Sequence, residues 1–74
     1  PLAEADAPLF EALRVWRADL AREQGVPAYV ILHDKSLREL VVRRPASPAE
    51  LLSVPGIGQA KADRYGEALL QILA

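Results

Sequence analysis

Cysteine is absent from this 74-residue chain, and histidine occurs only once. The absence of cysteine excludes a disulfide framework and thiolate chemistry, and a single histidine leaves no plausible zinc site. No apolar run approaches the length that spans a membrane, and the sequence has no signal-peptide pattern. We therefore expect no metal, no membrane partner and an intracellular setting.

Groupings of catalytic residues are missing as well. His33, Asp34 and Ser36 are neighbours in the sequence, whereas a catalytic triad needs its members to converge around a pocket. We interpret His33 as a solvated loop residue. Gly56 and Gly58 lack the third glycine of a dinucleotide-binding fingerprint, and no carboxylate cluster indicates metal-assisted hydrolysis. The sequence therefore predicts no catalytic residue and no cofactor of its own.

The chain also lacks a strong excess of charge of either sign. Nine basic and ten acidic side chains give a net charge of −1, whereas domains that bind nucleic acid strongly are usually clearly basic. Residues 1–34 carry three basic and six acidic groups, a net charge of −3, and residues 35–74 carry six and four, a net charge of +2. Two surfaces of opposite sign are therefore possible.

Apolar residues make up 51% of the sequence, which is enough for one small domain with a core. Because the chain begins at Pro1 rather than at methionine, we interpret it as a piece of a longer protein. Residues 1–7 show no apolar period and are predicted to be a linker remnant. Residues 8–74 are the predicted folded domain.

Apolar side chains recur at steps of three and four residues, which predicts a compact all-α, single-domain bundle of four to five helices. The expected helices are Pro8–Gln24, Asp34–Arg43, Pro48–Ser53 and Gly58–Leu73. Residues 27–32 are predicted to be an extended or 3₁₀ connector. Gly66 inside the last helix indicates either a close helix contact or a bend. The predicted common core consists of Leu13, Trp16, Leu40, Leu52 and Leu69.

Several residues predict how the helices begin and end. Asp6 is expected to cap the first helix, and Gly25 to end it. Ser47 and Glu50 stand at the two positions of a reciprocal capping box. Arg17, beside the apolar stripe of the first helix, is interpreted as a solvated or locally paired charge.

The stretch Val54–Lys61 predicts a tight turn between two helices. Gly56 supplies a positive φ, Ile57 is the apolar plug, and Gly58 stands where the last helix begins. An uncapped helix start with Lys61 and Arg64 close by favours negative charge, as in helix-hairpin-helix motifs that hold phosphates. A plain tight corner between two helices explains the same residues equally well.

The order and spacing of these segments resemble the HRDC domain, named for the C-termini of helicases and ribonuclease D. The similarity covers about residues 8–73 and is greatest to the bacterial RecQ type of DNA helicase. It rests on residues 9–17, 26–31, 34–37, 45–51 and 54–58, with Lys61 and Tyr65-Gly66. The resemblance implies a non-catalytic five-helix bundle that helps a helicase engage single-stranded or branched DNA in repair and recombination. It places the protein in the cytoplasm, at the nucleoid, and assigns ATP and Mg²⁺ to the parent helicase alone.

The resemblance also implies a nucleic-acid surface. Tyr29 matches the family's Pro-x-Tyr position, where a ring could stack on a base, and basic side chains lie near it in the sequence. The full candidate set is Tyr29, Lys35, Arg38, Gly56, Gly58, Lys61 and Arg64. The candidate inter-domain contacts are Glu11, Asp19 and Glu23 of the first helix.

Three functions remain open from the sequence. The first is a regulatory module that docks by charge on other domains of the same helicase, which the near-zero net charge favours. The second is direct, weak, sequence-independent binding of single-stranded DNA. The third is binding of RNA in a ribonuclease D context.

Overall fold

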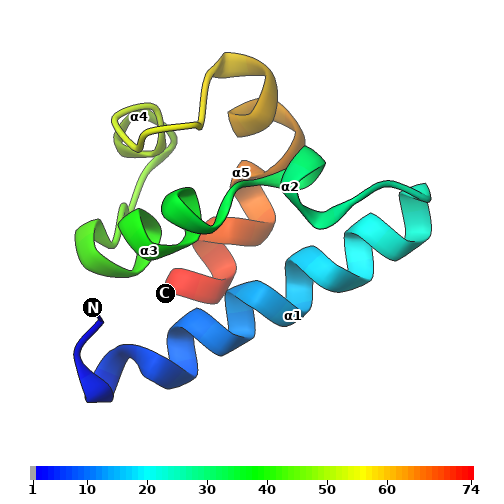
Figure 1. Ribbon diagram of the computed structural model, residues 1–74. Helices are drawn as coiled ribbons and strands as arrows, with labels where there is room; N and C mark the ends of the chain where they lie inside the picture. The colour runs from blue at the N-terminus through cyan, green and yellow to red at the C-terminus, as the bar shows by residue number, and fades with distance from the viewer. Residues whose placement is uncertain (1) are drawn as a thin grey trace.

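The computed structural model describes residues 2–74, which form five α-helices and contain no strand (Figure 1). The elements are the 3₁₀ turn η1 (Glu4–Asp6), α1 (Ala7–Gln24), α2 (Ala28–Ile31), α3 (Asp34–Arg43), α4 (Pro48–Leu51) and α5 (Gln59–Leu73). Helix α1 packs against α2, α3 and α5, and α4 packs against α5. The radius of gyration is 11.4 Å, close to the value of about 11 Å expected for one folded domain of this length. The prediction of an all-α bundle is confirmed.

The two ends of α1 are held differently from one another. Gly25 ends the helix in the left-handed region, at φ +66°, as predicted. Asp6 occupies the predicted N-cap position, but its side chain makes no cap hydrogen bond. Its carboxylate instead accepts a hydrogen bond from Arg44 at 3.3 Å, which ties η1 to the end of α3. Of the predicted linker, residue 1 lies outside the described residues, residues 2 and 3 are in no helix, residues 4–6 form η1, and residue 7 begins α1.

The predicted connector is a single helical turn, α2, so the extended or 3₁₀ prediction is wrong. Pro27 stands before it in the extended region, at ψ 151°, and the Leu32 N–H donates to the Ala28 carbonyl at 3.4 Å. One turn is not stable by itself in water. Ile31 and Leu32 are fully buried, and this burial stabilises the turn.

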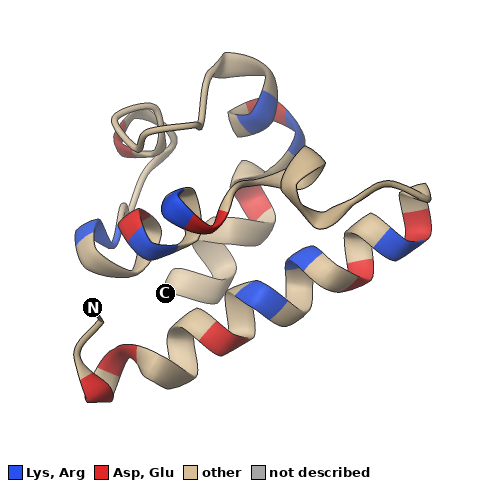
Figure 2. Cartoon of the chain, in the orientation of Figure 1, with Lys and Arg blue, Asp and Glu red and all other residues tan. Residues whose placement is uncertain are grey.

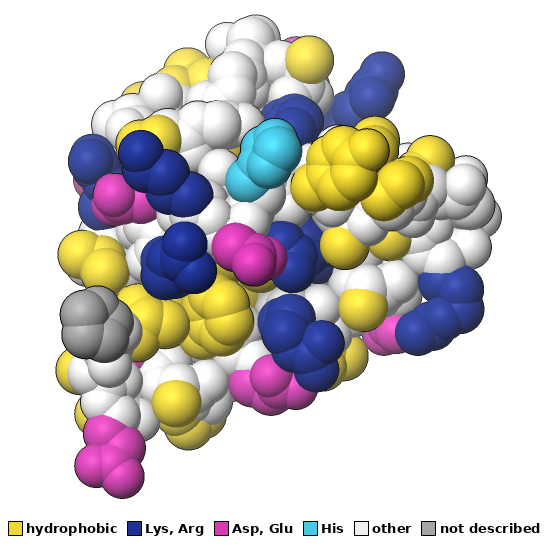
Figure 3. Space-filling view, in the orientation of Figure 1, with side chains coloured by type: hydrophobic (Ala, Val, Ile, Leu, Met, Phe, Trp, Pro, Cys, Tyr) yellow, Lys and Arg dark blue, Asp and Glu magenta, His cyan; other side chains and the backbone are white. Residues whose placement is uncertain are grey.

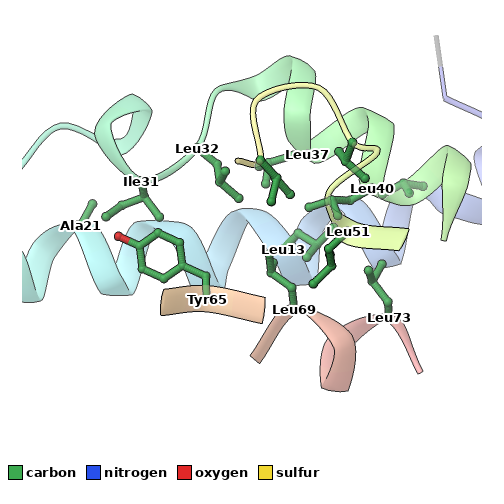
Figure 4. Close-up of a cluster of buried hydrophobic side chains, with 13 residues drawn as sticks. Leu13, Ala21, Ile31, Leu32, Leu37, Leu40, Leu51, Tyr65, Leu69 and Leu73 are labelled. Carbon is green, nitrogen blue, oxygen red and sulfur yellow. The ribbon is translucent and has the colours of Figure 1, made fainter. Parts of the chain in front are cut away.

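The core lies between the five helices, with Ile31 contributed by α2 (Figure 4). Leu13, Leu40 and Leu69 are fully buried, as predicted. The prediction for Leu52 is wrong, because 44% of it is exposed; α4 is a single turn and turns Leu51 inward instead. Trp16 is half-buried at the edge of the core, where its ring meets Tyr65 edge-on with centroids 5.6 Å apart.

The capping box before α4 forms in a shifted way. The Ser47 hydroxyl accepts the Glu50 N–H at 3.2 Å, as predicted. The Glu50 carboxylate accepts the N–H of Ala46 at 2.7 Å rather than that of Ser47. Two backbone N–H groups at the start of α4 therefore have side-chain acceptors.

The hairpin before α5 has the predicted backbone and is packed against α3. Gly56 has φ +88°, Gly58 is the N-cap of α5, and Ile57 is buried. The Ser36 hydroxyl donates to the Pro55 carbonyl at 2.8 Å, and a Cβ at Gly56 would collide with that hydroxyl. Glycine is therefore required at position 56 for two reasons, the positive φ and the close approach of α3.

Gly66 marks a close helix contact, and no break divides the helix in two there. Helix α5 is one helix from Gln59 to Leu73. A Cβ at Gly66 would lie 3.2 Å from the Leu51 side chain, so the glycine allows α4 to approach α5 closely.

Gly56→Ser is expected to lower the free energy of unfolding by about 1–3 kcal/mol, because it adds backbone strain and disturbs the Ser36 hydrogen bond. Thermal unfolding followed by circular dichroism measures this. Gly58→Ser is the matched control: Gly58 is extended with no atom within 4 Å of an added Cβ, and serine is a preferred N-cap. Equal melting temperatures for Gly56→Ser and the wild type would contradict the role of Gly56.

Candidate nucleic-acid interface

An open pocket of about 490 Å³ lies where α1, α2 and the start of α3 meet. It is lined by Arg17, Ala28, Tyr29, His33, Asp34 and Lys35. The chain's only histidine is visible on this face, with hydrophobic, basic and acidic side chains around it (Figure 3). Two aromatic rings and two cationic side chains therefore share one concave surface.

Tyr29 presents its ring to solvent rather than to the core. The residue is 60% exposed, like its neighbour Val30 at 45%, whereas Ile31 at the end of the same helix is fully buried. Its ring lies beside that of His33, with centroids 6.0 Å apart and planes 25° from parallel. The position of Tyr29, which the sequence left open, is thus that of an accessible stacking surface.

Arg17 lines the pocket and is buried, so the interpretation of this side chain as a solvated or locally paired charge is wrong. Only 8% of the residue is exposed. Its guanidinium donates to the Leu32 carbonyl at 2.9 Å and pairs with the Asp34 carboxylate at 2.8 Å. Its Nε is buried with no partner among residues 2–74. A signal for burial was present, because Arg17 falls midway between Leu13 and Ala21 at steps of four residues, on the buried face of α1.

The acidic candidates on α1 are mostly paired within the helix. Glu11 accepts two hydrogen bonds from Arg14, at 2.9 and 2.7 Å, and Asp19 pairs with Arg22 at 3.1 Å. The hydrogen bonds from Arg14 hold the pKa of the Glu11 carboxyl below its ordinary value. Glu23 has no ion pair among residues 2–74. Acidic and basic segments alternate along α1 (Figure 2), and its three acidic and three arginine side chains balance.

The basic candidates form no ion pair among residues 2–74. In the part of the chain that the structure describes, every ion pair uses an arginine outside the candidate set. The four without an ion-pair partner among residues 2–74 are Lys35, Arg38, Lys61 and Arg64. These are the side chains that the sequence singled out for nucleic acid.

The structure brings some of these residues together and separates others. Lys35 lines the pocket with Tyr29, and it also lines a second pocket of about 410 Å³ with Arg38 on α3. Lys61 and Arg64 lie on the first two turns of α5 and line neither pocket. Gly56 reaches this region through its contact with Ser36, which follows Lys35.

None of the helices that the structure describes is both long enough and apolar enough to cross a membrane. Residues 2–74 contain no group of three or more potential metal ligands.

A five-helix bundle with a glycine-dependent hairpin and an exposed ring beside unpaired basic side chains defines a class of small helical module. The chain belongs to the HRDC domain family, whose sequence model matches residues 6–73. The HRDC domain is an accessory domain of RecQ helicases.

Relatives and a solved structure agree with this assignment. The chain is 44% identical over 63 residues to the ATP-dependent DNA helicase RecQ of Bacillus subtilis, covering 85% of this chain and 11% of that protein. It is 39% identical over 71 residues to the ATP-dependent DNA helicase UvrD2 of Mycobacterium tuberculosis, covering 96% and 10%. HRDC domain 3 of D. radiodurans RecQ matches with a TM-score of 0.86 and 40% identity, covering 92% of this chain and 90% of that one. The chain thus spans about a tenth of the length of its curated relatives.

Arg17→Met is expected to lower the free energy of unfolding by about 1–3 kcal/mol, because the Leu32 carbonyl loses its donor in a buried place while the apolar volume is largely kept. Asp34→Asn is the control. The Asp34 side chain is 64% exposed, so we expect it to cost less than about 1 kcal/mol. Chemical denaturation of both variants measures the difference. A larger loss for Asp34→Asn would mean that the ion pair, not the carbonyl, holds α2 in place.

Proposed function

We propose that this domain is a non-catalytic accessory module of a RecQ-type DNA helicase, in which it regulates which DNA structures the enzyme engages. ATP and Mg²⁺ serve the parent helicase rather than this domain, and the site of action is the cytoplasm, at the nucleoid. The helicase relatives and the RecQ domain structure support this context. A UvrD2-type helicase is the alternative parent.

The observation that carries the DNA contact is the exposed ring of Tyr29 beside Lys35. An aromatic ring accepts any base, and a lysine without an ion-pair partner can contact a phosphate. Such a contact is independent of sequence, because neither group reads the edge of a base. Arg38 extends the basic surface along α3, and Lys61 and Arg64, with the hairpin glycines, are the candidates on α5.

The contact is expected to be weak, and weakness suits a regulatory role. A net charge of −1 gives little long-range attraction to a polyanion. Within a longer protein the domain is held near the DNA that the helicase already binds, at an effective concentration on the order of millimolar for a short flexible linker. A site of low affinity then adds measurably to the affinity of the whole enzyme while contributing little by itself.

Docking on other domains of the helicase is the second component of the proposal. Glu11, Asp19 and Glu23 lie on α1, whereas Arg38 and Lys61 lie on α3 and α5. Exposed charges at the rim of an interface mainly tune association and specificity. Because α1 is balanced overall, we expect its contacts to be made by individual side chains, Glu23 first, rather than by an acidic field.

Tyr29→Ala is expected to weaken binding of the 74-residue chain to single-stranded DNA about five- to a hundredfold, because stacking of one base on an aromatic ring contributes about this much to affinity. Fluorescence anisotropy at low salt measures this. Tyr29→Phe keeps the ring and should bind like the wild type. The domain should remain folded, since Tyr29 is exposed. Stronger binding of RNA than of DNA in the same titration would favour the ribonuclease D context.

Lys35→Ala is expected to reduce the salt dependence of the same binding. With two or three phosphate contacts the slope of log K against log salt is about −1.4 to −2, and loss of one contact should reduce its magnitude by about 0.7. Arg22→Ala is the matched control, because Arg22 is basic but paired with Asp19 on α1. Equal slopes for both variants would remove Lys35 from the DNA surface.

Charge changes at Glu23 or Lys61 in the complete helicase are expected to alter its preference among single-stranded, tailed and branched DNA, with about two- to fivefold changes in affinity, the scale of a rim charge. ATP hydrolysis should persist. Affinity for each DNA and ATPase rate are the measurements. If all charge variants match the wild type while the chain alone binds DNA tightly, direct binding replaces regulation as the role.

A further inference from the structure

We infer that His33 is a positioning residue for single-stranded DNA: its imidazole backs the ring of Tyr29 and holds it ready to stack on a base. The inference rests on the proposed DNA contact of Tyr29 and assigns a role to a residue that the sequence placed in solvent. Two features of the structure carry it, the ring pair and the backbone position of His33.

The first feature is the geometry of the two rings. Centroids 6.0 Å apart with planes 25° from parallel form an offset stack, an arrangement that aromatic rings favour. Tyr29 remains 60% exposed in this arrangement, so part of its ring is still open to a base. A ring that is already held loses less rotational freedom when a base stacks on it, and binding is correspondingly tighter.

The second feature is that His33 is not needed for the helix that it precedes. His33 is the N-cap residue of α3, in the extended region at φ −73° and ψ 157°, and its side chain makes no cap hydrogen bond. Asparagine and serine are much better caps at such a position. The imidazole therefore stands where a short polar side chain would make a more stable helix start. The ring that it lies against is that of Tyr29.

The backbone under the two rings is fixed by Arg17. The guanidinium bonds to the Leu32 carbonyl, which precedes His33, and pairs with Asp34, which follows it. Arg17 thus holds the backbone on both sides of His33, and this fixes where the imidazole lies relative to Tyr29. The charged groups that share the pocket with His33 are Arg17, Asp34 and Lys35.

The test compares His33→Asn with His33→Phe in the 74-residue chain, by fluorescence anisotropy with a fluorescent oligothymidine at one fixed pH. His33→Asn removes the ring and supplies a helix cap. It should melt at the wild-type temperature or higher, yet bind DNA about three- to tenfold more weakly. His33→Phe keeps a ring and should bind like the wild type. Val30→Ala is the control: Val30 is exposed and lies on α2 beside Tyr29, and this variant should bind like the wild type.

A double-mutant cycle then tests whether His33 acts through Tyr29. In the Tyr29→Ala background, His33→Asn should produce no further loss of affinity. An undiminished loss there, or a loss for His33→Phe equal to that for His33→Asn, would show a polar contact with DNA and overturn the inference. Wild-type affinity of His33→Asn together with weak binding of Tyr29→Ala would overturn it and leave the proposed function standing. Absence of any effect of Tyr29→Ala, or of any binding by the chain, would remove the inference together with the DNA contact of Tyr29, and would leave the docking component of the proposed function to its own test in the complete helicase.

Discussion

The geometry of the candidate interface depends on the buried guanidinium of Arg17. This guanidinium joins the middle of α1 to the end of α2 and the start of α3 through the Leu32 carbonyl and the Asp34 carboxylate. A one-turn helix has no stability of its own, so the placement of α2 is set by this contact and by the burial of Ile31 and Leu32. A guanidinium suits the task because its planar array of donors can serve a carbonyl and a carboxylate at once. One Nε without a partner is the cost of this geometry.

A second junction, between α3 and the hairpin, ties the other half of the domain to the same place. The Ser36 hydroxyl bonds to the Pro55 carbonyl, and the absence of a Cβ at Gly56 lets the turn come close enough. Lys35 therefore stands between two constrained neighbours, the Arg17–Asp34 pair on one side and the hairpin on the other. The candidate interface lies at the start of α3, where both junctions meet. Its geometry therefore depends on the packing of α1, α2, α3 and the hairpin together.

The distribution of ion pairs explains how a nearly neutral domain can still present a basic surface. Arginines on α1 and at the end of α3 are neutralised by acidic partners, whereas Lys35, Arg38, Lys61 and Arg64 have no ion pair among residues 2–74. Net charge counts all of these equally, but a phosphate close to the surface is sensitive to the uncompensated ones. The same arrangement keeps long-range attraction to a polyanion small.

The sequence by itself determined the features that depend on neighbours along the chain. The extent of α1 and α3, the left-handed stop at Gly25 and the positive φ at Gly56 follow from apolar periods and from glycine, and the structure agrees. The tertiary structure decided the features that depend on distant partners. Burial of Arg17 required the Leu32 carbonyl, exposure of Leu52 required α4 to be a single turn, and the stacking of His33 on Tyr29 required residues 28–31 to be helical. Local propensity cannot specify these, because a short apolar segment fits a strand, a connector or a helix until packing against α1 selects one of them.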